Sequence, residues 1–153
     1  MSHNDADILL VEDNPRDVKL TLHALQSRKL ANRIDVARDG QEALDYLFCQ
    51  GEHKSRSFDH PPRLVLLDLK LPGIDGLEVL RAVKGDPRTK TIPVVILTAS
   101  KEERDLVESY NLGVNAYIQK PVDFDQFRQI VDQTGLFWLV VNQAPIPPSA
   151  AAR

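Results

Sequence analysis

The sequence has few of the features that mark secreted or membrane proteins. It contains one cysteine, Cys49, so no disulfide can form within the chain. No apolar run approaches the roughly 18 residues that a membrane-spanning helix needs, and residues 1–7 are too polar and acidic for a signal peptide. We therefore expect a cytoplasmic protein with no membrane association, in which Cys49 lies on the buried side of a helix in a reducing compartment.

The sequence also lacks the signatures of several function classes. Its net charge of -3 gives no electrostatic support for binding nucleic acid. It has no Gly-x-Gly-x-x-Gly motif, so dinucleotide binding is excluded, and no internal repeat. His53 and His60 lie in a long polar stretch, 51–62, without a nearby cysteine or patterned acid. We interpret them as solvated loop residues and not as metal ligands.

What the sequence does contain is an alternation of short apolar runs with segments of helical periodicity. The runs predict strands at 8–11, 34–37, 64–67, 93–97 and 116–118. Helices are predicted after Asn14-Pro15, around 43–48, over 76–84, over 101–111 and from about 123. In the helix over 101–111 the few inward residues are expected to be Leu106, Val107 and Tyr110. The pattern predicts an α/β fold, a flavodoxin-like doubly wound parallel sheet of order 2-1-3-4-5 with five helices.

Polar residues follow four of the five predicted strands. Glu12 and Asp13 follow the first strand, Asp68 the third, Thr98 the fourth and Lys120 the fifth. Because the carboxyl ends of the first, third, fourth and fifth strands converge in this topology, these side chains should meet. One or two such placements could arise by chance, but five indicate a site.

The carboxylates of this predicted cluster point to a divalent cation. Carboxylates held close together repel one another and have raised pKa values unless a cation compensates them. Mg²⁺ prefers oxygen ligands and keeps several waters. We expect Asp13 and Asp68 to be direct ligands, Glu12 to act through water and the backbone carbonyl of Lys70 to supply another oxygen.

The remaining residues of the cluster suit phosphoryl transfer. Lys120 brings a point charge for phosphoryl oxygens, and Thr98 brings a hydroxyl that can donate to them. An aspartate such as Asp68 can be the nucleophile and form an aspartyl phosphate. Pro121 allows a cis peptide bond that would aim Lys120 back at the site.

Four motifs give the sequence a family resemblance. They are Leu-Val-Glu-Asp-Asn at 10–14, Leu-Leu-Asp-Leu-Lys-Leu-Pro-Gly-Ile-Asp-Gly at 66–76, Val-Ile-Leu-Thr-Ala-Ser at 95–100 and Tyr-Ile-Gln-Lys-Pro at 117–121. In this order they resemble the receiver domains of two-component response regulators, and the resemblance covers about residues 7–134. Residues 1–6 are then a flexible N-terminus, and residues 135–153 an apolar and then proline-rich extension.

The resemblance implies a role for each site residue. Asp68 would accept phosphate from a sensor histidine kinase, with Glu12 and Asp13 as the acidic pair that holds Mg²⁺. Thr98 would be the switch hydroxyl and Lys120 the contact to the phosphoryl group. Further implied are Tyr117 as the switch aromatic and Pro121 as the family's cis-proline. The signal would leave through the fourth helix, fifth strand and fifth helix to an unknown downstream protein.

The C-terminal extension carries six consecutive apolar residues, Leu136-Phe137-Trp138-Leu139-Val140-Val141. One face of a terminal helix cannot bury all six, so they either join two subunits or complete the core. This ending resembles that of stand-alone regulators paired with bacterial phytochromes. We therefore favour a homodimer and a phytochrome as the kinase partner.

Other readings of the sequence stay open at different strengths. A phosphatase of the haloacid dehalogenase type needs a second aspartate at position 70, where Lys70 stands, and a flavin binder would be repelled by Glu12 and Asp13. A pseudo-receiver that binds partners without phosphate is the rival that the acidic cluster argues against.

Lys70 would either slow hydrolysis of the phosphate or be solvated and inert, and the small Ala99 would leave the phosphate accessible.

Overall fold

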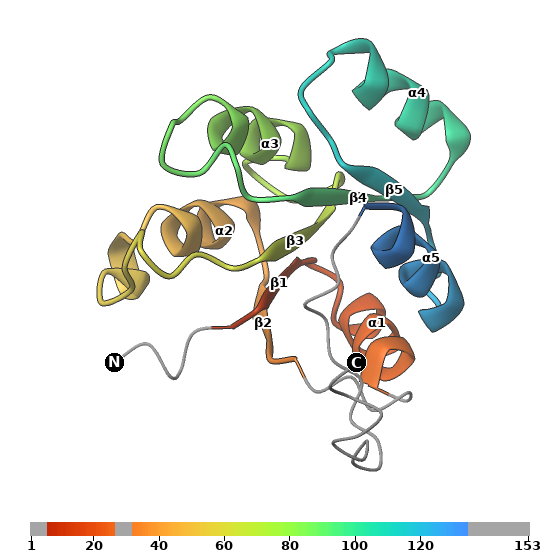
Figure 1. Cartoon of the computed structure of the whole chain (residues 1–153), viewed down its shortest axis with the longest axis horizontal. Coiled ribbons are helices and arrows are strands. Elements are labelled where there is room, and N and C mark those ends of the chain that lie inside the picture. Colours follow the sequence, from red (N-terminus) through yellow and green to blue (C-terminus); the bar gives the residue numbers. More distant parts are fainter. Residues whose placement is uncertain (1–5, 27–31, 135–153) are drawn as a thin grey trace, which may run out of the picture.

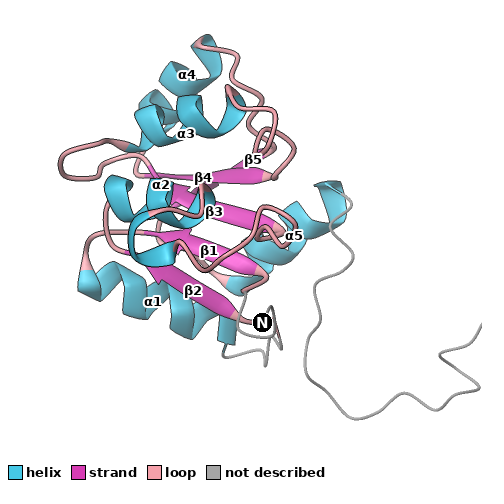
Figure 2. Ribbon diagram, turned by 90° about the vertical axis from the view of Figure 1, so that its left-hand side faces the viewer, coloured by secondary structure: helices cyan, strands magenta, loops and turns pink. Residues whose placement is uncertain are grey.

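A five-stranded parallel sheet forms the centre of the molecule. The computed structural model describes residues 6–26 and 32–134. The strands are β1 (Ile8–Val11), β2 (Ile34–Ala37), β3 (Leu64–Asp68), β4 (Val94–Thr98) and β5 (Ala116–Gln119). They pair in the order β2-β1-β3-β4-β5, and Figure 2 shows them stacked in this order. The predicted topology is confirmed.

Five α-helices cover the two faces of the sheet. They are α1 (Pro15–Gln26), α2 (Gly40–Leu47), α3 (Gly76–Lys84), α4 (Lys101–Ser109) and α5 (Phe124–Thr134). A short 3₁₀ helix, η2 (Gly51–His53), follows α2. In Figure 1, α2, α3 and α4 lie on one side of the sheet and α1 and α5 on the other. No helix in the described ranges is both long and apolar enough to cross a membrane.

The core lies on both faces of the sheet, which explains the unbroken apolar runs. In β1, Leu9 and Val11 pack with α2 and α3, while Ile8 and Leu10 pack with α1 and α5. All four are fully buried. A strand covered on both sides needs an apolar residue at every position, so only its end is free to carry polar chemistry.

Gly76 fixes the segment that follows β3. A Cβ atom at this position would lie 2.3 Å from the backbone oxygen of Asp68. The absence of a side chain therefore lets the first turn of α3 pack directly against the end of the strand. Asp75 caps this helix in a reciprocal arrangement with Glu78. The acceptor candidate Asp68 thus sits on a tightly packed strand-to-helix connection.

Two predictions about burial are wrong. Leu106 and Tyr110 are 55% and 44% exposed, and Val107 is the buried residue of α4. Leu106 and Tyr110 are four residues apart and therefore share one face, which is exposed to solvent. The guanidinium of Arg81 lies over the Tyr110 ring. Cys49 is not on a helix, because α2 ends at Leu47 and Cys49 adopts a positive φ in the turn beyond it.

The polar loop after α2 is held by side-chain contacts. His53 lies 3.5 Å from Glu42 and packs edge-on against the Tyr46 ring. Arg88 lies over the rings of Phe48 and Phe58. The interpretation of His53 as a solvated loop residue is therefore wrong, because it ends η2 and its side chain is half-buried. The apolar segment 136–141 lies outside the described residues, so the structure does not test its predicted role.

Candidate functional site

The register of the sheet brings the predicted site residues to one edge. Val11 pairs with Leu67, so Glu12 lies beside Asp68 at the ends of β1 and β3. Asp68 in turn pairs with Leu97, which places Thr98 one residue further along β4. The backbone N–H of Lys120 donates to the backbone oxygen of Thr98 at 2.8 Å. The ends of four strands therefore converge, as the sequence predicted.

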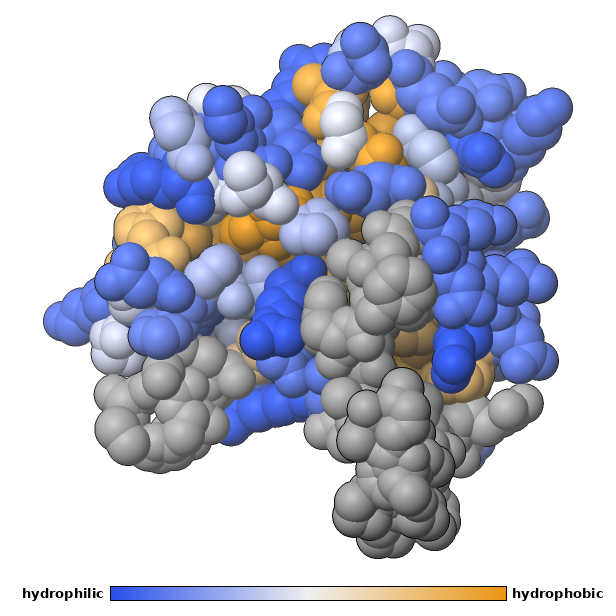
Figure 3. Space-filling view, viewed as in Figure 1, coloured by the Kyte–Doolittle hydropathy of each residue, from blue (hydrophilic) through white to orange (hydrophobic). Residues whose placement is uncertain are grey.

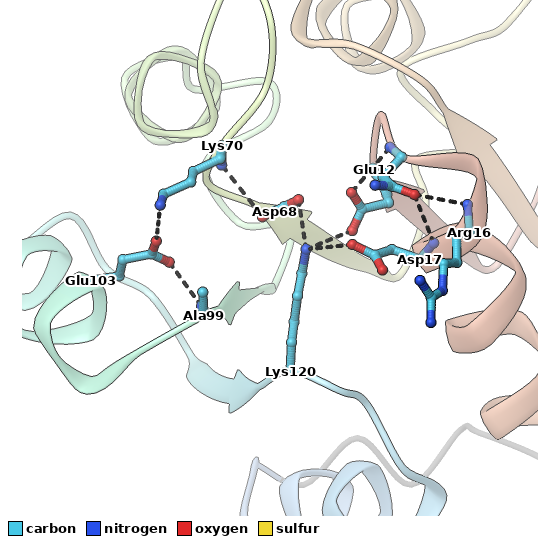
Figure 4. Close-up of polar contacts among 9 residues, drawn as sticks. Glu12, Arg16, Asp17, Asp68, Lys70, Ala99, Glu103 and Lys120 are labelled. Atoms are coloured by element: carbon cyan, nitrogen blue, oxygen red, sulfur yellow. Dashed lines mark hydrogen bonds and ion pairs between the residues drawn. The ribbon is translucent and has the colours of Figure 1, made fainter.

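The ammonium of Lys120 is the hub of the site (Figure 4). It donates to Asp68 Oδ2 at 2.8 Å and lies 2.9 Å from Glu12 Oε1 and 3.5 Å from Asp17 Oδ2. The Lys120–Pro121 peptide is cis, as predicted. The arrangement confirms that Lys120 points into the acidic cluster and does not extend into solvent.

Asp17 is a member of the site that sequence reasoning missed. It lies in the first turn of α1, whose N-cap is Asn14: the Asn14 side chain accepts hydrogen bonds from the amides of Arg16 and Asp17. An acid in the first turn of a helix is ordinary, because it complements the helix dipole. Only the fold reveals that this turn also faces Lys120.

Three carboxylates offer a site for a divalent metal ion. Glu12, Asp13 and Asp68 each contribute an oxygen, and these oxygens all lie within 4.8 Å of one another. Glu12 Oε1 is buried without an aligned hydrogen-bond donor in the described ranges, although the Lys120 ammonium is close. Hard oxygen ligands with excess negative charge fit Mg²⁺ or Mn²⁺. That the carbonyl of Lys70 also binds the metal stays a prediction.

Burial and charge shift the pKa values of the two central groups. Burial raises the pKa of Glu12 to about 7, and the neighbouring Asp68 adds to this while Lys120 opposes it. Burial alone would lower the pKa of Lys120, but its contacts with the Asp68 and Glu12 carboxylates raise it above the ordinary value. Lys120 is therefore charged at neutral pH, and the raised pKa of Glu12 favours its protonated form more than in an exposed glutamate.

The raised pKa of Glu12 predicts that Mg²⁺ stabilises the protein more at about pH 8 than at about pH 6. The folded protein holds a proton on Glu12 between its ordinary pKa of 4.5 and about 7. Stability without metal should thus fall as pH rises through this window. At about pH 6, inside this window, Mg²⁺ must displace the proton from Glu12, whereas at about pH 8 it need not. Thermal unfolding with and without Mg²⁺ measures the difference, and Glu12→Gln should remove it; equal shifts at both pH values would contradict the prediction.

Thr98 and Tyr117 lie on the α4 side of the site. Thr98 is 2% exposed and borders a cavity of about 480 Å³ between the strand ends and α4, together with Arg104 and Tyr117. Arg104 lies 4.9 Å above the Tyr117 ring. Tyr117 also borders a second cavity of about 200 Å³. The ring therefore has open space beside it.

Lys70 and Glu103 lie on the opposite side of Asp68 from Lys120 and Glu12 (Figure 4). The Lys70 amide is 3.4 Å from Asp68 Oδ1, but its ammonium lies 3.2 Å from Glu103 Oε2. Glu103 Oε1 accepts a hydrogen bond from the Ala99 amide at 2.9 Å. Sequence reasoning missed Glu103, although the pattern Ser100-x-x-Glu103 is a recognisable capping signal.

The fold and the site together define the class: a doubly wound α/β domain with an acidic metal-binding edge, as in phosphoacceptor signalling modules. The family model of the response regulator receiver domain matches residues 8–132. Two curated relatives agree over most of their lengths. The probable methanogenesis regulatory protein FilR2 of Methanothrix harundinacea is 43% identical over 92% of this chain and 88% of its own. The response regulator Rcp1 of Synechocystis is 40% identical over 90% and 92%. The chain belongs to the response regulator receiver family.

Within this family the chain is closely similar to phytochrome response regulators. The bacteriophytochrome response regulator AtBRR is 56% identical over 90% of this chain and 98% of its own, with a TM-score of 0.83. The phosphorylated cyanobacterial phytochrome response regulator RcpA is 44% identical over 87% and 93%, with a TM-score of 0.69. The Mn²⁺-bound form of Rcp1 is 38% identical over 92% and 99%, with a TM-score of 0.69.

Proposed function

We propose that Asp68 accepts a phosphoryl group from a histidine kinase and that the modified domain signals through the α4–β5–α5 surface. The observation that carries this proposal is the contact of the Lys120 ammonium with Asp68 Oδ2, at 2.8 Å, beside three carboxylates able to hold a metal. Support also comes from the relatives, which include a phosphorylated and a Mn²⁺-bound response regulator.

The chemistry follows from the groups around Asp68. A carboxylate oxygen of Asp68 attacks phosphorus while the bond from phosphorus to the kinase's imidazole nitrogen breaks. The nitrogen keeps the electron pair and takes a proton from solvent. Lys120, kept protonated by its neighbours, offsets charge on the transferred group. A Mg²⁺ ion held by Glu12, Asp13 and Asp68 would neutralise charge on the phosphoryl oxygens.

The signal would pass from the pocket to α4 and β5 through Thr98 and Tyr117. The Thr98 hydroxyl donates to a phosphoryl oxygen, and Tyr117 moves into the space that Thr98 leaves. The cavity bordered by both residues supports this proposal, because it gives the ring room to turn. The weak anchoring of α4, in which Val107 is the buried residue, would let the surface shift. Figure 3 shows mostly hydrophilic side chains over α4, with hydrophobic surface between the helices.

The partner and the assembly are inferred from similarity and sequence. Likeness to the bacteriophytochrome response regulator AtBRR favours a phytochrome histidine kinase as the donor, with a cytoplasmic site of action. The apolar segment 136–141 favours a homodimer. Sedimentation at micromolar concentration should show a dimer, with and without a phosphate mimic. A monomer under both conditions would contradict the dimer.

A labelling experiment tests the proposed function. The full chain is incubated with Mg²⁺ and acetyl phosphate, and its intact mass is measured before and after acid treatment. One acid-labile phosphate is expected for each chain, and chelation of Mg²⁺ should prevent its addition. A chain that folds and binds Mg²⁺ but takes up no phosphate from this donor or from histidine kinases would be a pseudo-receiver instead.

A further inference from the structure

The carboxylate of Glu103 contacts one hydrogen-bond donor and one cation close to Asp68. Its Oε1 accepts from the Ala99 amide at 2.9 Å, and its Oε2 lies 3.2 Å from the Lys70 ammonium. Ala99 follows Thr98 at the end of β4, and Lys70 lies two residues beyond Asp68. Because Asp68 pairs with Leu97, these two loop segments lie side by side. Glu103 thus links the loop after β3 to the loop after β4.

We propose that Glu103 is an internal anion that restrains phosphorylation by taking up these groups in the unmodified protein. The inference rests on the proposed role of Asp68 as the phosphoacceptor. In this view Glu103 occupies part of the positive surroundings that a phosphoryl group would use. When the phosphoryl group arrives, the Glu103 carboxylate has to move away and release the Lys70 ammonium and the Ala99 amide.

The electrostatics of the pocket support this role. A phosphoryl group brings about -1.5 to -2 charges and three acceptor oxygens to Asp68. The Glu103 side chain is 16% exposed, so solvent screens its negative charge only partly. In Figure 4, Lys70 contacts both Glu103 and Asp68 and so connects the two carboxylates. Two anions of this kind repel, and movement of the Glu103 carboxylate away from Asp68 would reduce the repulsion.

The contact is also of a kind that can open. Lys70 is 80% exposed, so its ion pair with Glu103 holds the two groups together only weakly. Glu103 lies in the first turn of α4, where its amide also donates to the Ser100 hydroxyl. Displacement of its side chain would keep this bond but remove the acceptor of the Ala99 amide at the start of α4. Glu103 would then tie the acceptor to α4 by a second connection, separate from Thr98 and Tyr117.

The inference is tested by the initial rate of labelling with acetyl phosphate at saturating Mg²⁺. Glu103→Gln removes the charge but keeps an oxygen for the Ala99 amide, and it is expected to speed labelling about three- to tenfold. Glu103→Ala should be at least as fast. Glu102→Gln is the matched control: the same charge is removed from an exposed position in the same turn, and the rate should stay within about twofold of the unmodified chain.

Ionic strength separates a charge effect from a structural one. Added salt should shrink the advantage of Glu103→Gln, because screening weakens repulsion in the unmodified chain. A structural role predicts no such convergence. If Glu103→Ala fails to fold, Glu103→Gln alone decides. An unmodified chain that is labelled at the same rate as Glu103→Gln, or faster, would overturn the inference and leave the proposed function standing. If the unmodified chain is labelled neither by acetyl phosphate nor by histidine kinases, the proposed function fails and the inference fails with it.

Discussion

Replacement of Asp68 by asparagine is expected to abolish labelling by acetyl phosphate, with a loss of at least about a hundredfold. The amide has no carboxylate oxygen to attack phosphorus. Its shape is nearly unchanged, and its side-chain oxygen can still accept from the Lys120 ammonium, which lies 2.8 Å from Asp68 Oδ2. Because Asp68 helps to raise the pKa of Glu12, its removal should also relieve repulsion in the metal-free pocket. The variant should therefore fold normally and bind Mg²⁺ more weakly.

The matched control for this variant is Asp59→Asn. Asp59 lies exposed in the loop before β3, so the same chemical change is made away from the pocket. Intact mass measured after a fixed incubation should show one phosphate on the control and none on Asp68→Asn. Undiminished labelling of Asp68→Asn would show that another carboxylate is the acceptor, and Asp13 would be the next candidate to test.

The sheet and its polar edge were predictable because both follow from local sequence. Leu64 to Leu67 form an unbroken apolar run since β3 is covered on both faces, and Asp68 comes where that cover ends. The alternation of strands and helices then leaves few topologies, so the convergence of four strand ends follows. The same logic predicts that Glu12 and Lys120 lie at this edge.

The residues that sequence reasoning missed act across long separations. Asp17 and Glu103 both lie in first helical turns, where an acid needs no special explanation. Their second contacts, to Lys120 and Lys70, depend on how α1 and α4 are placed over the strand ends. No spacing rule in the sequence gives that placement. A carboxylate in a helix cap near a predicted site therefore merits testing as a site residue.

The error in α4 has a different cause. The helix is short and has few apolar residues, so the direction of its buried face rests on very few positions. Leu106, Val107 and Tyr110 looked equally suited to burial, yet only Val107 faces the sheet. The remaining two leave an exposed apolar pair on the helix that borders the larger cavity. This weak anchoring is itself consistent with the movable role proposed for α4.

Replacement of Lys120 by methionine is expected to slow labelling of Asp68 by about ten- to a hundredfold and to remove most of the phosphate-driven change at α4 and β5. Methionine keeps much of the apolar stem but lacks the ammonium that contacts Asp68, Glu12 and Asp17. The phosphoryl group would then lose a fixed positive partner, one of the groups that position it. Mg²⁺ should still bind, because its three carboxylates remain.

Loss of the ammonium should also lower the stability of the protein, because the neighbouring carboxylates then repel one another without a compensating cation. Glu12 is 1% exposed, and loss of Lys120 removes a charge that opposes the upward shift of its pKa. Between about pH 6 and about pH 8 the Lys120→Met protein should accordingly lose more stability than the unmodified chain, and Mg²⁺ should restore part of the loss. Lys54→Met, at an exposed loop position, is the matched control. Amide chemical shifts of α4 and β5, recorded with beryllofluoride and Mg²⁺, report the conformational change. Shifts as large as in the unmodified chain would remove Lys120 from the switch.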